Sequence, residues 1–455
     1  MTTALPGREA ISAKLFADEA TVVRELAAKA KLSAEEGRST AGLATNLVQA
    51  VRKNRQKQGS IDAFMQEYSL SSEEGVVLMC LAEALLRIPD GATADKLIAD
   101  KIGGKDWQSH IGQSDSLFVN ASAWGLMLTG KFIELGQAKF DVAGFLKRMV
   151  SRSGEPVIRQ AMKQAMRIMG KQFVLGRTIQ EALAVAKAQE AEGYRVSYDM
   201  LGEAAMTMHD ADRYLASYHG ALQAVAKAAG PNEAGVFGMP SISVKLSALH
   251  PRYEEKTEAR VMAELRPRVM ELALAAKKAG IGLTIDAEEV NRLDISLELF
   301  GSIAADPALK GWDGLGLAVQ AYSKRAYPVI EWLAELGTRT GRRLPVRLVK
   351  GAYWDTEVKR AQENGYEAYP LFTRKVSTDV SYLACARLML ARRDVFYPQF
   401  ATHNAQTLAA ISVMAGNDRS FEFQRLHGMG EALYDEVVGA DKMSLPCRIY
   451  APVGS

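Results

Sequence analysis

VRLVKG, residues 346–351, is the stretch that decides the fold of this 455-residue chain. Its β-branched and leucine residues are typical of a buried strand, and the Lys-Gly pair marks where that strand ends. The pattern recurs in seven further segments. They are Tyr194–Leu201, Ser241–Leu249, Gly282–Ala287, Leu315–Ala321, Phe400–Asn404, Phe421–Leu426 and Arg448–Pro452.

Amphipathic helical segments separate most of these strands, for example Glu258–Lys278 and Lys324–Arg339. Alternation of strands and helices indicates parallel strands joined by helical crossovers. Eight such units within about 260 residues match the size of a βα barrel rather than an open sheet. No GxGxxG fingerprint follows a strand, which argues against a dinucleotide-binding open sheet. We therefore predict an α/β fold with a distorted (βα)8 TIM-type barrel.

Helical spacing dominates the residues before about 190. Apolar residues recur three or four apart in Ile11–Ala30, Gly42–Lys57, Glu73–Ile88 and Pro156–Gly170. The sequence thus predicts an all-helical arm over 1–60, a helical domain over 61–185 and the barrel over 186–455.

The composition is that of an ordinary soluble protein, with 48% hydrophobic and 24% charged residues. A net charge of only +3 gives no reason to expect nucleic acid as a partner. The cysteines Cys80, Cys385 and Cys447 form no CxxC pair, which fits a reducing cytoplasm. The longest apolar run, Gly75–Leu86, contains Glu83 and is shorter than the ~20 residues that span a membrane. We expect a cytoplasmic protein.

The carboxyl ends of the predicted strands are unusually polar. In a βα barrel these ends meet at one mouth, where the chemistry takes place. Singly, each residue has a structural reading: Lys245 pairing with Asp286, His403-Asn404 capping a helix, Arg347 lying on a solvated edge. Burying them all at one rim is costly unless they form a site.

Basic and neutral donors outnumber acids at this rim, which favours a large anionic ligand such as a cofactor pyrophosphate. Neither HExxH nor a Cys/His cluster with ligand spacing occurs, so no metal is expected. Two alternatives remain. In the first, the chain is a Schiff-base aldolase whose nucleophile is Lys245 or Lys350. In the second, it is a non-catalytic scaffold that assembles through its arm.

Seven motifs closely resemble the proline dehydrogenase domain of the proline utilization A family, in order along the barrel half. They are VKLSALHPRYE (244–254), TIDAEE (284–289), RLVKGAYWDTE (347–357), FTRKVSTDVSY (372–382), FATHNAQT (400–407), FEFQRLHGMGEALY (421–434) and PCRIYAPVG (446–454). The N-terminal half resembles that family's arm and helical domain more loosely.

The resemblance implies noncovalent FAD at the carboxyl end of the barrel, with Arg347, Asp286 and Lys245 at the catalytic centre. The cofactor contacts that it implies are Asp286, Val319, Gln320, Arg347, Lys350, Gly351, Ala352, Trp354, Thr373, Arg374, Lys375, Thr402, His403, Asn404 and Gln424. The proline pocket that it implies consists of Lys245, Asp286, Ala352, Tyr353, Leu426 and Tyr450.

The implied reaction transfers a hydride from the ring carbon of L-proline to flavin N5, giving Δ1-pyrroline-5-carboxylate, and passes electrons to a quinone. Peripheral contact with the inner membrane during turnover, and an oligomeric state, are compatible with this. In the family, a helix after the last strand carries paired arginines that hold the proline carboxylate. This sequence stops at Ser455, before that helix, so we expect impaired proline affinity and turnover.

Overall fold

The computed structural model describes residues 5–54, 173–230 and 235–454. The chain divides into two compact units, Met1–Lys53 with Val174–Ser455, and Asn54–Phe173. The description that follows concerns the first unit. The helices predicted over 73–88 and 156–170 lie outside the described residues, and the domain boundaries at 60 and 185 stay predictions.

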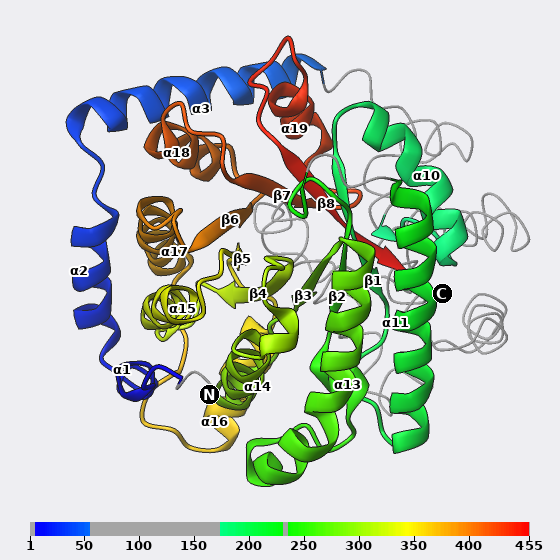
Figure 1. Ribbon diagram of the computed structural model, residues 1–455. Helices are drawn as coiled ribbons and strands as arrows, with labels where there is room; N and C mark the ends of the chain where they lie inside the picture. Colours follow the sequence, from blue (N-terminus) through cyan, green and yellow to red (C-terminus); the bar gives the residue numbers. More distant parts are fainter. Residues whose placement is uncertain (1–4, 55–172, 231–234, 455) are drawn as a thin grey trace, which may run out of the picture. The chain divides into compact units, whose positions relative to one another are not determined.

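Eight parallel strands close into a barrel, which confirms the predicted fold class. Each strand pairs with the next along the chain, and the last pairs with the first, Arg195 opposite Arg448 and Met200 opposite Val453. Figure 1 shows the strands at the centre, with helices around them. The strands are β1 (Arg195–Met200), β2 (Ser241–Val244), β3 (Gly282–Ile285), β4 (Leu315–Gln320), β5 (Leu344–Val349), β6 (Phe396–Ala401), β7 (Glu422–Leu426) and β8 (Cys447–Val453).

The crossovers are helices, and some of their ends carry the expected capping residues. Thr207 caps one of them in a reciprocal capping box with Asp210. Gly280 ends another in the left-handed region, at φ 69°. The helices are α10 (Ile179–Ala191), α11 (Met208–Ala229), α12 (Leu246–Leu249), α13 (Glu258–Ala279), α14 (Leu293–Ala304), α15 (Ala326–Thr340), α16 (Trp354–Glu363), α17 (Lys375–Ala391), α18 (Ala405–Ala415) and α19 (Glu431–Val438).

Two strand predictions were wrong in their bounds. The strand predicted over Ser241–Leu249 ends at Val244, and the buried residues after it form the short helix α12. A continuous apolar run does not distinguish strand from helix by periodicity. The strand predicted over Phe400–Asn404 is β6, which begins at Phe396 and ends at Ala401.

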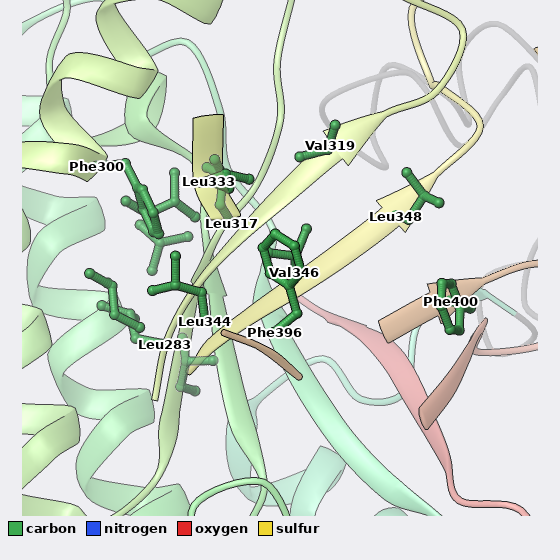
Figure 2. Close-up of a cluster of buried hydrophobic side chains, with 14 of the residues drawn as sticks. Leu283, Phe300, Leu317, Val319, Leu333, Leu344, Val346, Leu348, Phe396 and Phe400 are labelled. Atoms are coloured by element: carbon green, nitrogen blue, oxygen red, sulfur yellow. The ribbon is translucent and has the colours of Figure 1, made fainter. Parts of the chain in front are cut away.

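The hydrophobic core lies between the barrel and its helices. Alternate strand residues such as Leu283, Leu317 and Val346 point outward and pack against Phe300 of α14 and Leu333 of α15 (Figure 2). Because side chains of a strand alternate between its faces, the other residues of each strand point into the barrel. The apolar residues are therefore used on the outer face, and the interior is left for polar side chains.

The arm comprises α1 (Glu9–Ser12), α2 (Glu19–Ala30) and α3 (Ala34–Asn54). The single helix predicted over Ile11–Ala30 was wrong. The chain breaks before Asp18, whose side chain accepts a hydrogen bond from the Thr21 N–H and begins α2. Helix α2 packs on α17, where Leu26 and Phe372 share a small buried cluster. Among the described helices, none is long and apolar enough to cross a membrane.

Candidate functional site

The barrel interior is filled by hydrogen-bonded polar groups centred on Arg347 of β5. Its Nη2 donates to the Ser243 hydroxyl (2.8 Å) and its Nε donates to the Gln424 amide oxygen (2.7 Å). Its Nη1 forms a buried ion pair with Asp286, at the end of β3. A guanidinium can only donate, and here acceptors from four other strands or strand ends, including the Ser197 hydroxyl of β1 (3.3 Å from Nη2), hold it in one orientation.

Lys245, at the end of β2, pairs with Asp199 of β1, with 2.9 Å between Nζ and Oδ2. The predicted structural ion pair between Lys245 and Asp286 is therefore wrong, because Asp286 pairs with Arg347. Burial alone would lower the pKa of Lys245, but the carboxylates of Asp199 and Asp286 raise it above its ordinary value. Lys245 is accordingly an ammonium at neutral pH.

The Tyr450 hydroxyl bridges the two ion pairs. It lies 2.7 Å from Asp199 Oδ2 and 2.8 Å from Asp286 Oδ2. Its ring also lies under the Arg347 guanidinium, with 4.9 Å from the guanidinium carbon to the ring centroid. Burial and the two carboxylates raise the pKa of Tyr450 well above its ordinary value, so the phenol keeps its proton. The Tyr450 hydroxyl proton is therefore shared between the carboxylates of Asp199 and Asp286.

A cavity of about 580 Å³ opens above this network, at the carboxyl ends of the strands. Its wall holds five basic side chains and one carboxylate, so it favours an anionic ligand. The structure brings together around it most of the residues predicted for the site. These are Lys245, Asp286, Gln320, Arg347, Lys350, Gly351, Ala352, Tyr353, Lys375, Thr402, His403, Asn404, Gln424, Leu426 and Tyr450.

The remaining predicted residues lie off this wall. Val319 packs in the apolar core (Figure 2). Trp354 is 40% exposed, and its indole N–H donates to the Phe372 carbonyl (3.0 Å). Thr373 donates its N–H and its hydroxyl to Glu19 of the arm, and Arg374 directly precedes α17. The cofactor contacts proposed for these four residues stay predictions.

Gly351 follows β5 at a point of the cavity wall where a side chain would collide with the Tyr322 ring. Its φ is +142°, and a Cβ there would lie 2.4 Å from the Tyr322 ring, so only glycine fits. The neighbouring Lys350 is held by an ion pair with Asp379 of α17, which Lys375 also contacts (3.0 Å). Two ammonium groups are thus fixed by one carboxylate at this side of the cavity.

His403 and Asn404 follow β6 and play different parts. The Asn404 side chain accepts a hydrogen bond from the Thr407 N–H and caps α18, as the structural reading proposed. His403 Nε2 accepts from the Leu426 N–H (3.0 Å), which places the ring proton on Nδ1. Desolvation and the Arg425 guanidinium lower the pKa of His403 to about 4, so its ring is neutral at pH 7.

Four polar residues inside the strands were not predicted for the site, namely Ser197, Asp199, Ser243 and Glu422. The signal that finds them is period-two spacing: Ser197 and Asp199, or Glu422 and Gln424, are separated by one outward-facing residue. Among the described residues, no group of three or more His, Cys, Asp or Glu is placed to hold a metal ion.

A βα barrel with a polar interior beneath a cavity at the carboxyl ends of its strands has the arrangement of the barrel enzymes, whose sites lie at that mouth. The family model described as "Proline dehydrogenase" matches residues 182–455. The chain belongs to the proline dehydrogenase family. A model described as "Proline utilization A proline dehydrogenase N-terminal domain" matches residues 6–52 as well.

More particularly, the chain is similar to bifunctional PutA proteins. It is 53% identical to that of Klebsiella aerogenes, covering 98% of this chain and 35% of the relative. It is 52% identical to that of Escherichia coli K12, covering 98% and 34%. The chain thus spans about a third of the length of these relatives. The proline dehydrogenase of Deinococcus radiodurans is 26% identical, covering 68% of this chain and 89% of that protein.

Solved structures agree. The Bradyrhizobium japonicum proline utilization A mutant D779W has a TM-score of 0.72 and 44% identity, covering 97% of this chain and 44% of that one. A proline utilization A structure "with proline bound in remote sites" has a TM-score of 0.73 and 46% identity, with the same coverage.

A third family model, described as "DNA-binding domain of Proline dehydrogenase", matches residues 60–173, which lie mostly outside the described residues. The expectation that nucleic acid is not a partner therefore finds no support. That expectation rested on the net charge of the whole chain, which does not report on one segment.

Proposed function

We propose that this chain is a flavin-dependent proline dehydrogenase that oxidises L-proline to Δ1-pyrroline-5-carboxylate, with FAD as its cofactor. The observation that carries the proposal is the cavity above Arg347, Asp286 and Lys245, in a chain whose barrel matches the proline dehydrogenase family. The family is flavin-dependent in general, and FAD is the member of that cofactor class that the donors favour.

The residues around the cavity fit a flavin dinucleotide in chemistry. Gly351 lines the cavity at the end of β5, and its lack of a side chain lets the Tyr322 ring pack directly against its backbone. Lys350 and Lys375 supply positive charge for a pyrophosphate. Arg347 and Gln424 supply polar hydrogen-bonding groups for the edge of the ring. Thr373 and Arg374 would hold the adenosine side, and the Trp354 ring would pack on the cofactor.

A flavin held there would supply the hydride-accepting chemistry, at N5, for the proline ring carbon, and the electron transfer to a quinone. The protein groups orient the reactants. Arg347 is fixed by Asp286 and so keeps one charge against the ring edge. The Lys245 ammonium offers a counter-charge for the substrate carboxylate. Leu426, Tyr353 and Ala352 line the wall and restrict water around the substrate.

A Schiff-base aldolase is less well supported. Its nucleophile must be a neutral amine, whereas the pKa of Lys245 is raised by its carboxylate neighbours. Lys350 is held by Asp379 in an ion pair. Lys245 therefore stays charged, and both lysines are engaged by carboxylates rather than positioned as free amines. A cytoplasmic location, with contact at the inner membrane when quinone is reduced, is part of the same proposal.

An absorbance spectrum of the purified protein, titrated anaerobically with proline, tests the proposal. A flavin spectrum that bleaches with proline supports the dehydrogenase. A spectrum that dithionite bleaches but proline does not would support the cofactor and reject proline oxidation by this chain. Absence of flavin binding after added FAD would overturn the cofactor as well.

A second activity is favoured by the match over residues 60–173, and we propose that this segment binds duplex DNA. Electrophoretic shift of a random-sequence duplex at several salt concentrations tests it. Binding that weakens steeply with salt supports it, because phosphate contacts release counterions. No shift at low salt would reject it.

A further inference from the structure

Glu422 of β7 is fully buried and lies beneath the wall of the cavity without lining it. Its Oε1 accepts hydrogen bonds from Arg448 Nε (2.7 Å), Gln399 Nε2 (2.9 Å) and Gln424 Nε2 (2.9 Å). Its Oε2 accepts from Arg448 Nη2 (3.1 Å) and Arg195 Nη1 (3.2 Å). One carboxylate thus organises donors from four strands.

The Gln424 amide connects this carboxylate to the cavity. Its nitrogen donates to Glu422, and its oxygen accepts from Arg347 Nε (2.7 Å). If the amide were turned over, its nitrogen would face the Arg347 N–H, and its oxygen would face the Glu422 carboxylate. Two donors would then oppose each other, and so would two acceptors. The amide therefore has one favourable orientation, as long as Glu422 accepts.

We propose that Glu422 is a positioning residue for the reaction: it fixes the orientation of the Gln424 amide and through it the Arg347 guanidinium at the cofactor site. The inference rests on the proposed function. Arg347 has further contacts, with Asp286 and with the Ser243 and Ser197 hydroxyls, so Glu422 sets the geometry at the Nε side of the guanidinium rather than whether the guanidinium is present. Glu422 itself touches neither the cavity nor, by its place, any reacting atom.

The charges around Glu422 keep it an acceptor. Burial alone would raise its pKa, but the guanidinium groups of Arg448 and Arg195 hold that pKa below its ordinary value. Arg448 is itself anchored by the Met239 and Phe237 carbonyls (2.8 and 2.7 Å). The carboxylate thus stays ionised between two fixed cations, and its Oε1 stays available to Gln424.

If Glu422 were only structural, its replacement would affect all of its hydrogen-bond partners alike. In the proposed role, its replacement affects the site only through Gln424. The variant E422Q removes the charge and lets the amide turn. E422D keeps the charge between Arg448 and Arg195 but draws the oxygen back from Gln424, so it serves where E422Q does not fold. Tyr397→Phe is the control, because the Tyr397 hydroxyl donates to Oε2 of Glu422 (3.4 Å) and accepts from Arg195 Nη1 (2.9 Å), away from the Oε1 that holds Gln424.

The decisive experiment is a double-mutant cycle between position 422 and Gln424→Met. Two quantities are measured: the rate of flavin reduction at saturating proline, and the dissociation constant for FAD added to the apo-protein. The melting temperature of each apo-protein is recorded beside them. We expect E422Q or E422D to slow reduction about tenfold or weaken FAD about tenfold, the order of one charge-assisted hydrogen bond. Tyr397→Phe should stay within about twofold.

In the Gln424→Met background, the change at 422 should have no further effect, because the amide that transmits it is gone. Effects that simply multiply, or that follow the melting temperature across all variants, would overturn the proposal. If the wild-type flavin is not reduced by proline, the proposed function fails, but the cycle is still read on FAD affinity. The two failures are thereby distinguishable.

Discussion

All three nitrogens of the buried Arg347 guanidinium have an acceptor, which shows at the scale of one residue how a buried charge is stabilised. Its partners Asp286, Ser243 and Gln424 come from separate parts of the chain and meet only in the closed barrel. Loss of the guanidinium would leave Asp286 as a buried carboxylate without its cation, and such losses cost more than the pair itself contributes.

We therefore predict that Arg347→Met lowers the stability of the apo-protein by about 3–5 kcal/mol and reduces its flavin content. Urea unfolding followed by circular dichroism measures the first effect, and absorbance of the purified protein the second. Arg393→Met is the matched control, since its pair with Asp418 is partly exposed and worth less than about 1 kcal/mol. Equal unfolding midpoints for the two variants would contradict the prediction.

His403 gives a pH dependence. Its pKa is about 4 in the folded chain and about 6.5 in the unfolded one, so the unfolded chain binds the proton more tightly. The stability it contributes is complete above pH ~6.5 and is lost as the pH falls toward 4. We predict that His403→Gln, whose amide can still accept from the Leu426 N–H, flattens the decline of melting temperature over this window. Parallel curves for the two proteins would refute it.

Sequence reasoning located the site well where position along a strand decides it. Lys350, Gly351 and Gln424 were predicted from strand ends and motif, and they line one cavity. The partner of Lys245 was not predictable, because two carboxylates are available and the choice depends on how β1 and β2 pair. Ser243 lies opposite Asp199, which brings Asp199 beside the end of β2.

At the scale of elements, the strands could be predicted because the residues on their outer face are apolar. The bounds failed where apolarity continued past a strand, as at Leu246–Leu249, or where the strand held a proline, as β6 does at Pro398. The single helix predicted over Ile11–Ala30 of the arm was wrong because Asp18 caps a new helix within a run whose apolar spacing continues. Capping geometry depends on backbone angles that spacing alone does not give.

The contact of α2 with α17 yields a prediction of its own. Leu26 is buried against Phe372, the residue before Thr373. Leu26→Ala should lower stability by about 2–3 kcal/mol and speed hydrogen exchange in the peptide that holds Phe372 and Thr373. Val48→Ala, on an exposed arm position, is the control. Unchanged exchange in that peptide would show that the arm does not support this loop.

At the scale of the described barrel, closure gives each strand two neighbours. β1 and β8 are paired with each other over their whole length, so they should be as protected as the central pair β4 and β5. We predict slow, similar hydrogen exchange in peptides from all four strands, measured by mass spectrometry of the native protein. Exchange many times faster in β1 and β8 would indicate that the barrel opens at that seam.

The pairing of β1 with β8 also has a consequence for synthesis. Asp199 and its partner Tyr450 are 251 residues apart. At the usual translation rates of roughly 5–20 residues per second, β1 leaves the ribosome on the order of 10–50 s before β8 exists. Through that interval the backbone edge of β1 lacks β8, and the Asp199 carboxylate lacks the Tyr450 hydroxyl, although its partner Lys245 follows only 46 residues after it. The nascent chain therefore needs either a temporary binding partner for the free edge of β1 or a delay in the collapse of the first strands until β8 has been synthesised.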